Sequence, residues 1–121
     1  MSLINSLEGS GERVNLVAED DRTLGIIRIT DGIRVGEVAV SGGADSLTIE
    51  HLCIDTEHRS YGAGSETARL LVAGAHAAGV VRIRSWAHPN LGLSVYFWSR
   101  MGFSPRHGEG PEGGIWFERG L

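Results

Sequence analysis

The sequence contains no lysine, a single cysteine and only three prolines, and these scarcities exclude several classes of protein. All 11 basic residues are arginines, and 15 acidic residues outnumber them, which gives a formal net charge of −4 at pH 7. A nucleic-acid-binding domain needs a basic excess on its surface, so no nucleic-acid partner is expected. The lone Cys53 cannot form an internal disulfide, which fits a reducing compartment.

Long hydrophobic runs are missing as well. No apolar run approaches the roughly 20 residues of a membrane span, and residues 1–11 lack the basic flank and apolar stretch of a secretion signal. We therefore expect no membrane partner and a cytoplasmic location. The 121 residues provide for one hydrophobic core, so residues 1–121 are assigned to one domain. Within it, the polar, glycine-bearing residues 1–12 are expected to be flexible.

What the sequence does contain is a succession of β-like stretches followed by two helical patterns. Short polar turns separate the first strands, which favours an antiparallel meander. The expected strands are Val14–Ala18, Leu24–Thr30, Val35–Val40, Leu47–Ile54, Val80–Ala87, Phe103–Ser104 and Ile115–Arg119. One helix is expected from Ser65 to Gly79, and a second from Pro89 to Gly102.

The order of these elements predicts an α/β fold of the α+β type, with a mixed, mostly antiparallel, curved sheet and two main helices. The first helix connects the strands at 47–54 and 80–87. A strand–helix–strand crossover of this kind makes the two strands parallel neighbours.

The stretch from Ile54 to Gly64 carries the clearest chemical signal. A strand leads into a loop of small residues, and a helix follows at once, so free backbone N–H groups and the helix dipole converge on one spot. This arrangement suits a phosphate or pyrophosphate, and Arg59 and Ser65 can add donors. A P-loop is excluded because it requires a lysine, and a Rossmann fingerprint because position 67 is threonine. A glycine turn without any ligand remains the alternative.

The segment Arg59-Ser60-Tyr61-Gly62-Ala63-Gly64, which follows the strand Ile49–Asp55, resembles the acetyl-CoA signature of the GNAT N-acetyltransferase superfamily. That signature is a strand, then [Arg/Gln]-x-x-Gly-x-[Gly/Ala], then a helix. Asn90 and the later Gly102-Phe103 are similar to the second landmark of the family, an asparagine before a helix that ends in Gly-Phe. The resemblance covers about residues 14 to 104.

The resemblance implies an acyl-CoA N-acyltransferase-like fold and acetyl-CoA as cosubstrate. Backbone groups of the strand would hold the pantetheine arm between the splayed strands 47–54 and 80–87, and the loop would hold the pyrophosphate. The cofactor-binding residues implied are Leu52, Cys53, Ile54, Arg59, Ser60, Tyr61, Gly62, Ala63, Gly64, Ser65 and Asn90. The side chain of Cys53 is expected to be a small buried hydrophobe.

Direct acetyl transfer needs a base for the attacking amine and, in some cases, an acid for the departing thiolate. Strand alternation places Glu50 on the face opposite the core, where it is our candidate base; a merely solvated carboxylate is the alternative. His51 is expected to point the other way, under a helix. The family commonly has a tyrosine that acts as the general acid, and in this sequence its position is occupied by Trp98. Tyr96 and Ser94 remain as candidate proton donors to the thiolate.

Taken together, these features predict an N-acetyltransferase that moves acetyl from CoA to a small-molecule or protein amine by direct attack. The alternative is a non-catalytic CoA-binding or interaction module with a degenerate GNAT fold. No metal is expected, because no two of the five histidines are spaced as metal ligands. The family usually has a first strand and two helices before the meander, and only about a dozen residues stand there in this chain. We therefore expect an incompletely covered sheet and a homodimer.

Overall fold

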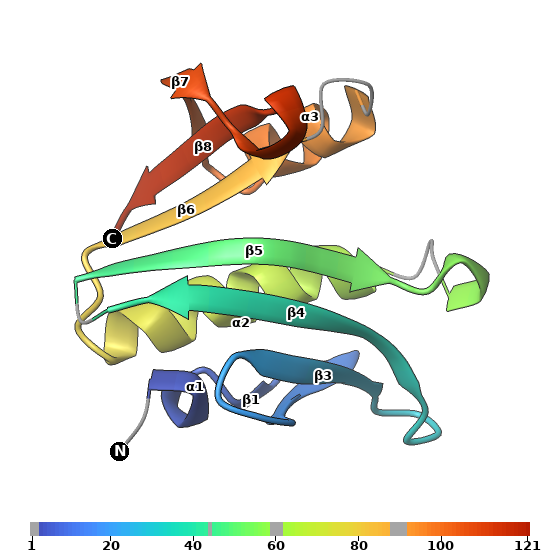
Figure 1. The fold of residues 1–121 in the computed structure, drawn as a ribbon. Helices are drawn as coiled ribbons and strands as arrows, with labels where there is room; N and C mark the ends of the chain where they lie inside the picture. Colours follow the sequence, from blue (N-terminus) through green and yellow to red (C-terminus); the bar gives the residue numbers. More distant parts are fainter. Residues whose placement is uncertain (1–2, 44, 59–61, 88–91) are drawn as a thin grey trace.

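A computed structural model describes residues 3–43, 45–58, 62–87 and 92–121. They form one eight-stranded sheet in the spatial order β1-β2-β3-β4-β5-β6-β8-β7 (Figure 1). The strands are β1 (Gly9–Ser10), β2 (Val14–Ala18), β3 (Thr23–Arg28), β4 (Arg34–Gly42), β5 (Ser46–Ile54), β6 (Arg82–Ala87), β7 (Ser104–Glu109) and β8 (Ile115–Gly120).

All neighbouring strand pairs are antiparallel except β5–β6, which is parallel. The short connections within β2–β5 permit only antiparallel pairing, whereas a helix crosses over between β5 and β6. The fold class predicted from the sequence, a mostly antiparallel mixed sheet with two main helices, is therefore confirmed.

The helices are α1 (Leu3–Ser6), α2 (Ala63–Ala77) and α3 (Gly92–Arg100), with short 3₁₀ turns η1 (Thr56–His58) and η2 (Pro111–Gly113). Helix α2 begins two residues earlier than the sequence predicts. Gly62 adopts the left-handed conformation, with φ 75°, and serves as the N-cap, so the helical turn starts at Ala63. Pro89 and Asn90, where the second helix was expected to open, lie outside the described residues.

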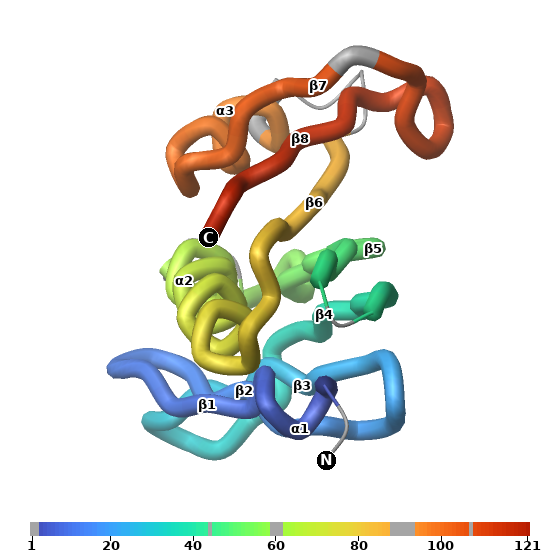
Figure 2. Tube along the Cα trace, turned by 90° about the vertical axis from the view of Figure 1, so that its left-hand side faces the viewer, coloured from blue at the N-terminus to red at the C-terminus, as the bar shows by residue number. Residues whose placement is uncertain are grey.

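The core lies between α2 and the sheet. Residues of α2 spaced by three and four, Ala68, Leu71 and Ala75, are buried, as the helical pattern predicts. Alternate residues of the strands meet them from the other side, including Leu16, Leu24, Ile26, Val38, Val40, Leu47, Ile49 and Ile83. Figure 2 shows α2 and α3 on the same side of the sheet. No helix of the described ranges covers the opposite face of β4 and β5, which we call the outer face.

The N-terminal segment differs from the expectation of a flexible tail. Residues 3–10 form α1 and β1, β1 pairs with β2, and Leu7 is fully buried. Composition suggested fraying because the segment is polar and contains glycine. Only the tertiary structure provides the hydrophobic surface on which Ile4 and Leu7 pack. Among the described residues, no helix has the length and apolar character needed to cross a membrane.

Candidate active site

Strands β5 and β6 pair over only a short stretch and then separate. Ser46, Leu47 and Thr48 are in register with residues 82–84 of β6. Beyond this point β5 continues beside β4 as far as Ile54, and β6 continues beside β8 as far as Ala87. The two strands therefore form a V that opens toward their C-terminal ends, as the resemblance implied for the pantetheine arm.

The floor of this V is a small cavity of about 160 Å³, lined by residues 49–52 of β5, by Trp86 of β6 and by Ser94 and Trp98 of α3. The indole Nε1–H of Trp86 donates a hydrogen bond of 2.7 Å to the backbone carbonyl of Glu50. This contact bridges the separated strands and fixes the width of the V at its base. The sequence did not identify Trp86 as a residue of the site. Its only signal there is that it alternates with the inward-facing residues of the expected strand 80–87.

A β-bulge at Glu50 decides which side chains face the V. On β4, Ala39 pairs with His51 and Val40 pairs with Ile49, so Glu50 has no partner of its own. An extra residue in one strand breaks the alternation of faces. Glu50 is on the outer face, as predicted. The prediction for His51 is wrong: the bulge brings its side chain to the outer face too, where it is 48% exposed.

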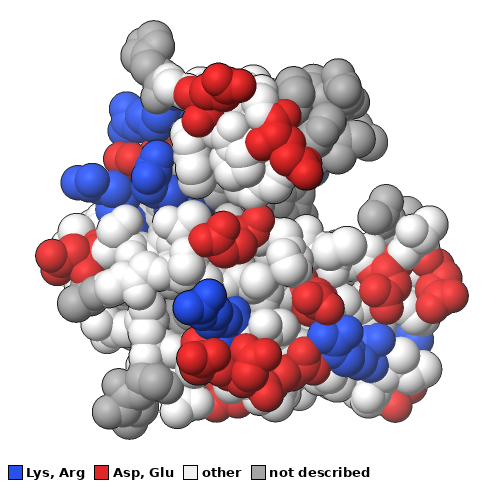
Figure 3. All heavy atoms as spheres, in the orientation of Figure 1, with Lys and Arg blue, Asp and Glu red and all other residues white. Residues whose placement is uncertain are grey.

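Polar contacts anchor these side chains on the outer face. The Ser41 hydroxyl donates to the Glu50 carboxylate, and Nε2 of His51 lies 3.0 Å from Oε2 of Glu37. The hydrogen bond from His51, and then that from Arg34, holds the pKa of Glu37 below its ordinary value. Figure 3 shows acidic side chains spread over this face across β3 to β5.

Cys53 differs from the sequence prediction in two respects. Its side chain is exposed rather than buried, because the residues after the bulge alternate in the opposite phase. Its backbone groups also face β4: Asp55 N–H donates to Val35, and in an antiparallel ladder the residues two positions away, Cys53 with Glu37, bond in the same way.

The backbone polar groups of Leu52 and Ile54 are consequently directed to the β6 side, into the V. Their side chains are half-buried on the helix face and pack against the core. Of the three β5 residues expected to contact the coenzyme, these two therefore present backbone groups to the opening, and Cys53 does not.

The N-terminus of α2 faces the open end of the V. The first helical N–H to find an acceptor four residues back is that of Glu66, which bonds to the Gly62 carbonyl. The N–H groups of Ala63, Gly64 and Ser65 have no such acceptor, since nothing helical precedes them. They border a cavity of about 210 Å³ together with Ile54, His58, Gly62 and Phe97. The predicted Arg59, Ser60, Tyr61 and Asn90 lie outside the described residues.

Glu66 has a role that sequence reasoning did not find. Its Oε1 accepts hydrogen bonds from the backbone N–H groups of Arg13 and Val14, at 2.7 and 2.8 Å. The carboxylate also lies in the first turn of α2, where the helix dipole stabilises negative charge. Gly11 makes the approach feasible, because a Cβ there would lie 2.2 Å from the same oxygen. This contact ties the start of β2 to the helix that carries the anion site.

The candidate donors on α3 are placed differently from one another. Trp98 is buried, with edge contacts to Phe97 and Phe103, and it borders the cavity at the base of the V. Tyr96 is 62% exposed and lies under the guanidinium of Arg100, at 5.6 Å, whereas Ser94 lines that cavity. Of the two hydroxyls named from the sequence, only Ser94 lines the V.

Asp55, Glu57 and His58 have their ligand-type atoms within 4.8 Å of one another. Both ring nitrogens of His58 already face side chains of the protein. NH1 of Arg28 lies 3.3 Å from Nδ1, and Oε1 of Glu57 lies 3.6 Å from Nε2.

The fold and the V-shaped opening define a class of structure: the chain has the acyl-CoA N-acyltransferase fold of the GNAT acetyltransferases. The sequence itself matches no protein-family model and no curated protein. The PaiA N-acetyltransferase of Thermoplasma acidophilum, solved with coenzyme A, is 15% identical, with a TM-score of 0.71 over 82% of this chain and 60% of that one.

Two further solved structures are similar to the same extent. An acetyltransferase from Thermus thermophilus is 23% identical, with a TM-score of 0.70, over 85% of this chain and 67% of that chain. A GNAT family acetyltransferase from Elizabethkingia anophelis, with acetyl-CoA bound, is 11% identical, with a TM-score of 0.67, over 83% of this chain and 77% of that chain. The chain thus spans about 60 to 77% of the length of these three proteins.

Proposed function

We propose that this protein binds acetyl-CoA and transfers its acetyl group to an amine. The observation that carries the proposal is the alignment of two features: the separated strands β5 and β6, and the N-terminus of α2 at their open end. One offers the facing edges of two strands that no longer pair with each other for an amide-bearing arm, and the other offers backbone N–H groups for a pyrophosphate. Structures of the same fold contain CoA or acetyl-CoA.

In this proposal the pyrophosphate contacts the backbone N–H groups of Ala63, Gly64 and Ser65, with Arg59, Ser60, Tyr61 and Gly62 completing the loop. The pantetheine arm runs along the β6-facing edge of β5, where Leu52 and Ile54 supply backbone groups. Asn90 meets the arm from the other side, as the family resemblance implies. The acetyl group then lies near the bulge, beside the cavity bordered by Glu50 and Trp86.

The reaction is a nucleophilic substitution at the thioester. The lone pair of a neutral amine attacks the carbonyl carbon, a C–N bond forms, and the C–S bond breaks to release the CoA thiolate. The amine loses a proton, for which we assign Glu50 as base, directly or through one water. Glu50 is exposed, and Ser41 orients its carboxylate. Water or Ser94 protonates the thiolate, since Tyr96 lies outside the cavity.

The acceptor is proposed to approach from the outer face. Carboxylates of this face attract a cationic amine and raise its local concentration. A small molecule and a protein side chain or terminus both fit an open face. We further propose that a second copy of the chain completes the acceptor side in a homodimer in the cytoplasm. Light scattering that finds a monomer at every concentration would contradict the dimer and leave the proposed enzyme activity unaffected.

A non-catalytic CoA-binding module is the second candidate, and one observation favours it: the position of the family's tyrosine is occupied by the buried Trp98. Measuring CoA binding by calorimetry, and thiol release from acetyl-CoA with a panel of mono-, di- and polyamines, separates the two. Binding with turnover supports the enzyme, and binding without turnover for any amine supports the module. Absence of CoA binding would remove both.

A further inference from the structure

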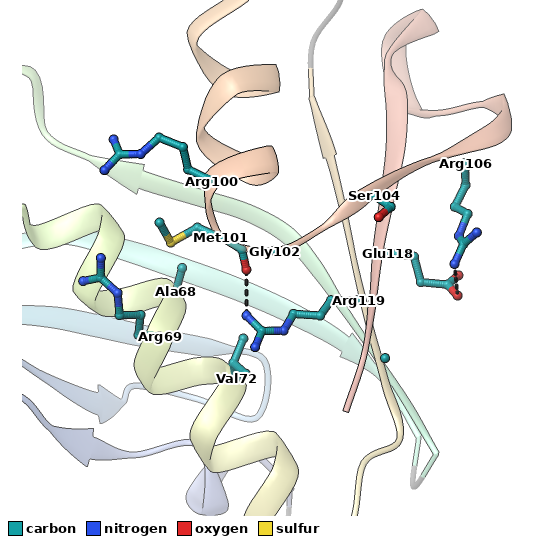
Figure 4. A pocket seen from close by; sticks show the side chains of 11 residues that line it. Ala68, Arg69, Val72, Arg100, Met101, Gly102, Ser104, Arg106, Glu118 and Arg119 are labelled. Atoms are coloured by element: carbon teal, nitrogen blue, oxygen red, sulfur yellow. Dashed lines mark hydrogen bonds and ion pairs between the residues drawn. The ribbon is translucent and has the colours of Figure 1, made fainter.

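A larger cavity, of about 590 Å³, lies on the helix side of the molecule, between α2, the C-terminal end of α3 and strands β7 and β8 (Figure 4). It shares no lining residue with the two cavities of the candidate active site. Four arginines line it, each from a different element: Arg69 of α2, Arg100 of α3, Arg106 of β7 and Arg119 of β8. Alanine, valine and methionine side chains form its apolar part.

Only part of this positive charge is neutralised locally. Four of the 11 arginines of a chain with net charge −4 meet at one cavity, and Glu118 is the only acidic residue among its described lining residues. Arg106 at 3.6 Å and Arg82 at 3.5 Å already engage that carboxylate. Like charges gathered in one place attract an anion of opposite sign, so the cavity favours a negatively charged ligand.

The arginines also retain unused donors. Within the described ranges, Arg69 makes no hydrogen bond and no ion pair, and Figure 4 shows it extending to the same side as Arg100 from the facing helix. Arg119 is held in place, because its NH1 donates a 2.7 Å hydrogen bond to the carbonyl of Met101 at the end of α3. Gly102, with φ +84°, leaves the space for it: a Cβ there would lie 3.1 Å from the same NH1.

We propose that this cavity is a binding site for a small phosphate monoester, separate from the coenzyme site. Arg69, Arg100 and Arg119 come from three different elements and line the same cavity. A phosphate monoester presents three terminal oxygens to these guanidinium groups, whereas a carboxylate presents only two, and guanidinium groups bind phosphate oxygens in pairs. The volume is typical of small-molecule sites. The apolar surface of Ala68, Val72 and Met101 suits the organic part of the ester.

Calorimetry with phenyl phosphate as the probe tests the proposal, with phenol as the neutral control. We expect saturable one-to-one binding that weakens with added salt, and no binding of phenol. Arg69→Gln should weaken binding roughly tenfold or more, because a charge-assisted hydrogen bond is lost. Arg22→Gln is the matched control: it removes the same charge at the exposed β2–β3 turn and should leave the affinity unchanged.

Four results would overturn the proposal. The first is no binding of phenyl phosphate at millimolar concentration, and the second is equal affinities for Arg69→Gln and the parent protein. The third is displacement of the probe by saturating CoA, which would make these arginines part of the coenzyme site. The fourth is tighter binding of phthalate, which would assign the site to dicarboxylates. Arg100→Gln, at an exposed position, repeats the test if Arg69→Gln fails to fold.

Discussion

A carboxylate introduced at position 64 is expected to weaken coenzyme A binding, whereas a methyl group there should only stabilise the fold. Gly64 is the second residue of α2, and it does not have a positive φ. A Cβ there would lie 3.7 Å from Cε1 of Phe97 and 3.8 Å from Cγ1 of Ile54. These are ordinary van der Waals distances, so Gly64→Ala fits the structure as it stands.

The two substitutions are expected to act on different properties. Alanine is favoured over glycine inside a helix by about 0.5–1 kcal/mol, which for a domain of this size raises Tm by roughly 2–5 °C. The signature that this loop resembles accepts alanine at this position, so Gly64→Ala should leave CoA binding unchanged. Gly64→Asp instead adds a negative charge at the border of the proposed pyrophosphate site. That charge repels the pyrophosphate, and the affinity for CoA should fall about ten- to a hundredfold.

Calorimetry with CoA and thermal unfolding of the same preparations measure both effects. Gly79→Ala is the matched control, at the other end of α2. Its φ is +87° and no atom lies within 4 Å of the added Cβ, so it should cost about 1–2 kcal/mol of stability and leave CoA binding unchanged. Gly62→Ala, at φ +75°, should cost both stability and affinity. A folded Gly64→Asp protein that binds CoA as tightly as the parent would refute the assignment of the anion site.

Three other predictions concern carboxylates. If Glu50 is the base, Glu50→Gln should retain CoA binding and lower the rate about 100- to 10,000-fold, with a loss that shrinks as pH rises and free amine accumulates; a pH–rate profile parallel to that of the parent contradicts this role. Hydrogen bonds from Arg34 lower the pKa of Glu19 and contribute to lowering that of Glu37. The ion pairs of Arg34 with Glu19 and Glu37 therefore stabilise the fold above the ordinary pKa of 4.5. This stabilisation is lost as the pH falls through the two lowered pKa values. Arg34→Gln should cost about 0.5–1 kcal/mol at pH 7 and almost nothing at pH 3, and an equal cost in urea titrations at both pH values would exclude the ion pairs as the cause. Glu66→Ala should lower the free energy of unfolding by about 2 kcal/mol, since two hydrogen bonds to a charged acceptor are lost, and hydrogen exchange at the start of β2 should accelerate; unchanged exchange would mean that the contact does not hold the segment.

Much of the fold followed from local patterns along the chain. Val14–Ala18 is a strand with the predicted bounds, and the helix stripe of Ala68, Leu71 and Ala75 is buried as predicted. Such patterns are local because side chains return to the same face every two residues in a strand and about every 3.6 residues in a helix. Chain connectivity added the parallel pairing of β5 with β6, since a helix packed on the sheet returns the chain to the end where the previous strand began.

The details of the candidate site depended on tertiary structure. The bulge at Glu50 arises from pairing with β4, which no pattern within β5 records, and it reversed the faces of His51 and Cys53. Contacts between residues far apart in the chain were equally hidden: Trp86 with Glu50, Glu66 with Arg13, and the arginine-lined cavity of α2, α3, β7 and β8. Sequence periodicity determines which residues share a face within one element, whereas the register between elements determines which of those faces meet. That register is set by packing of the whole chain, so only the tertiary structure could place these side chains together.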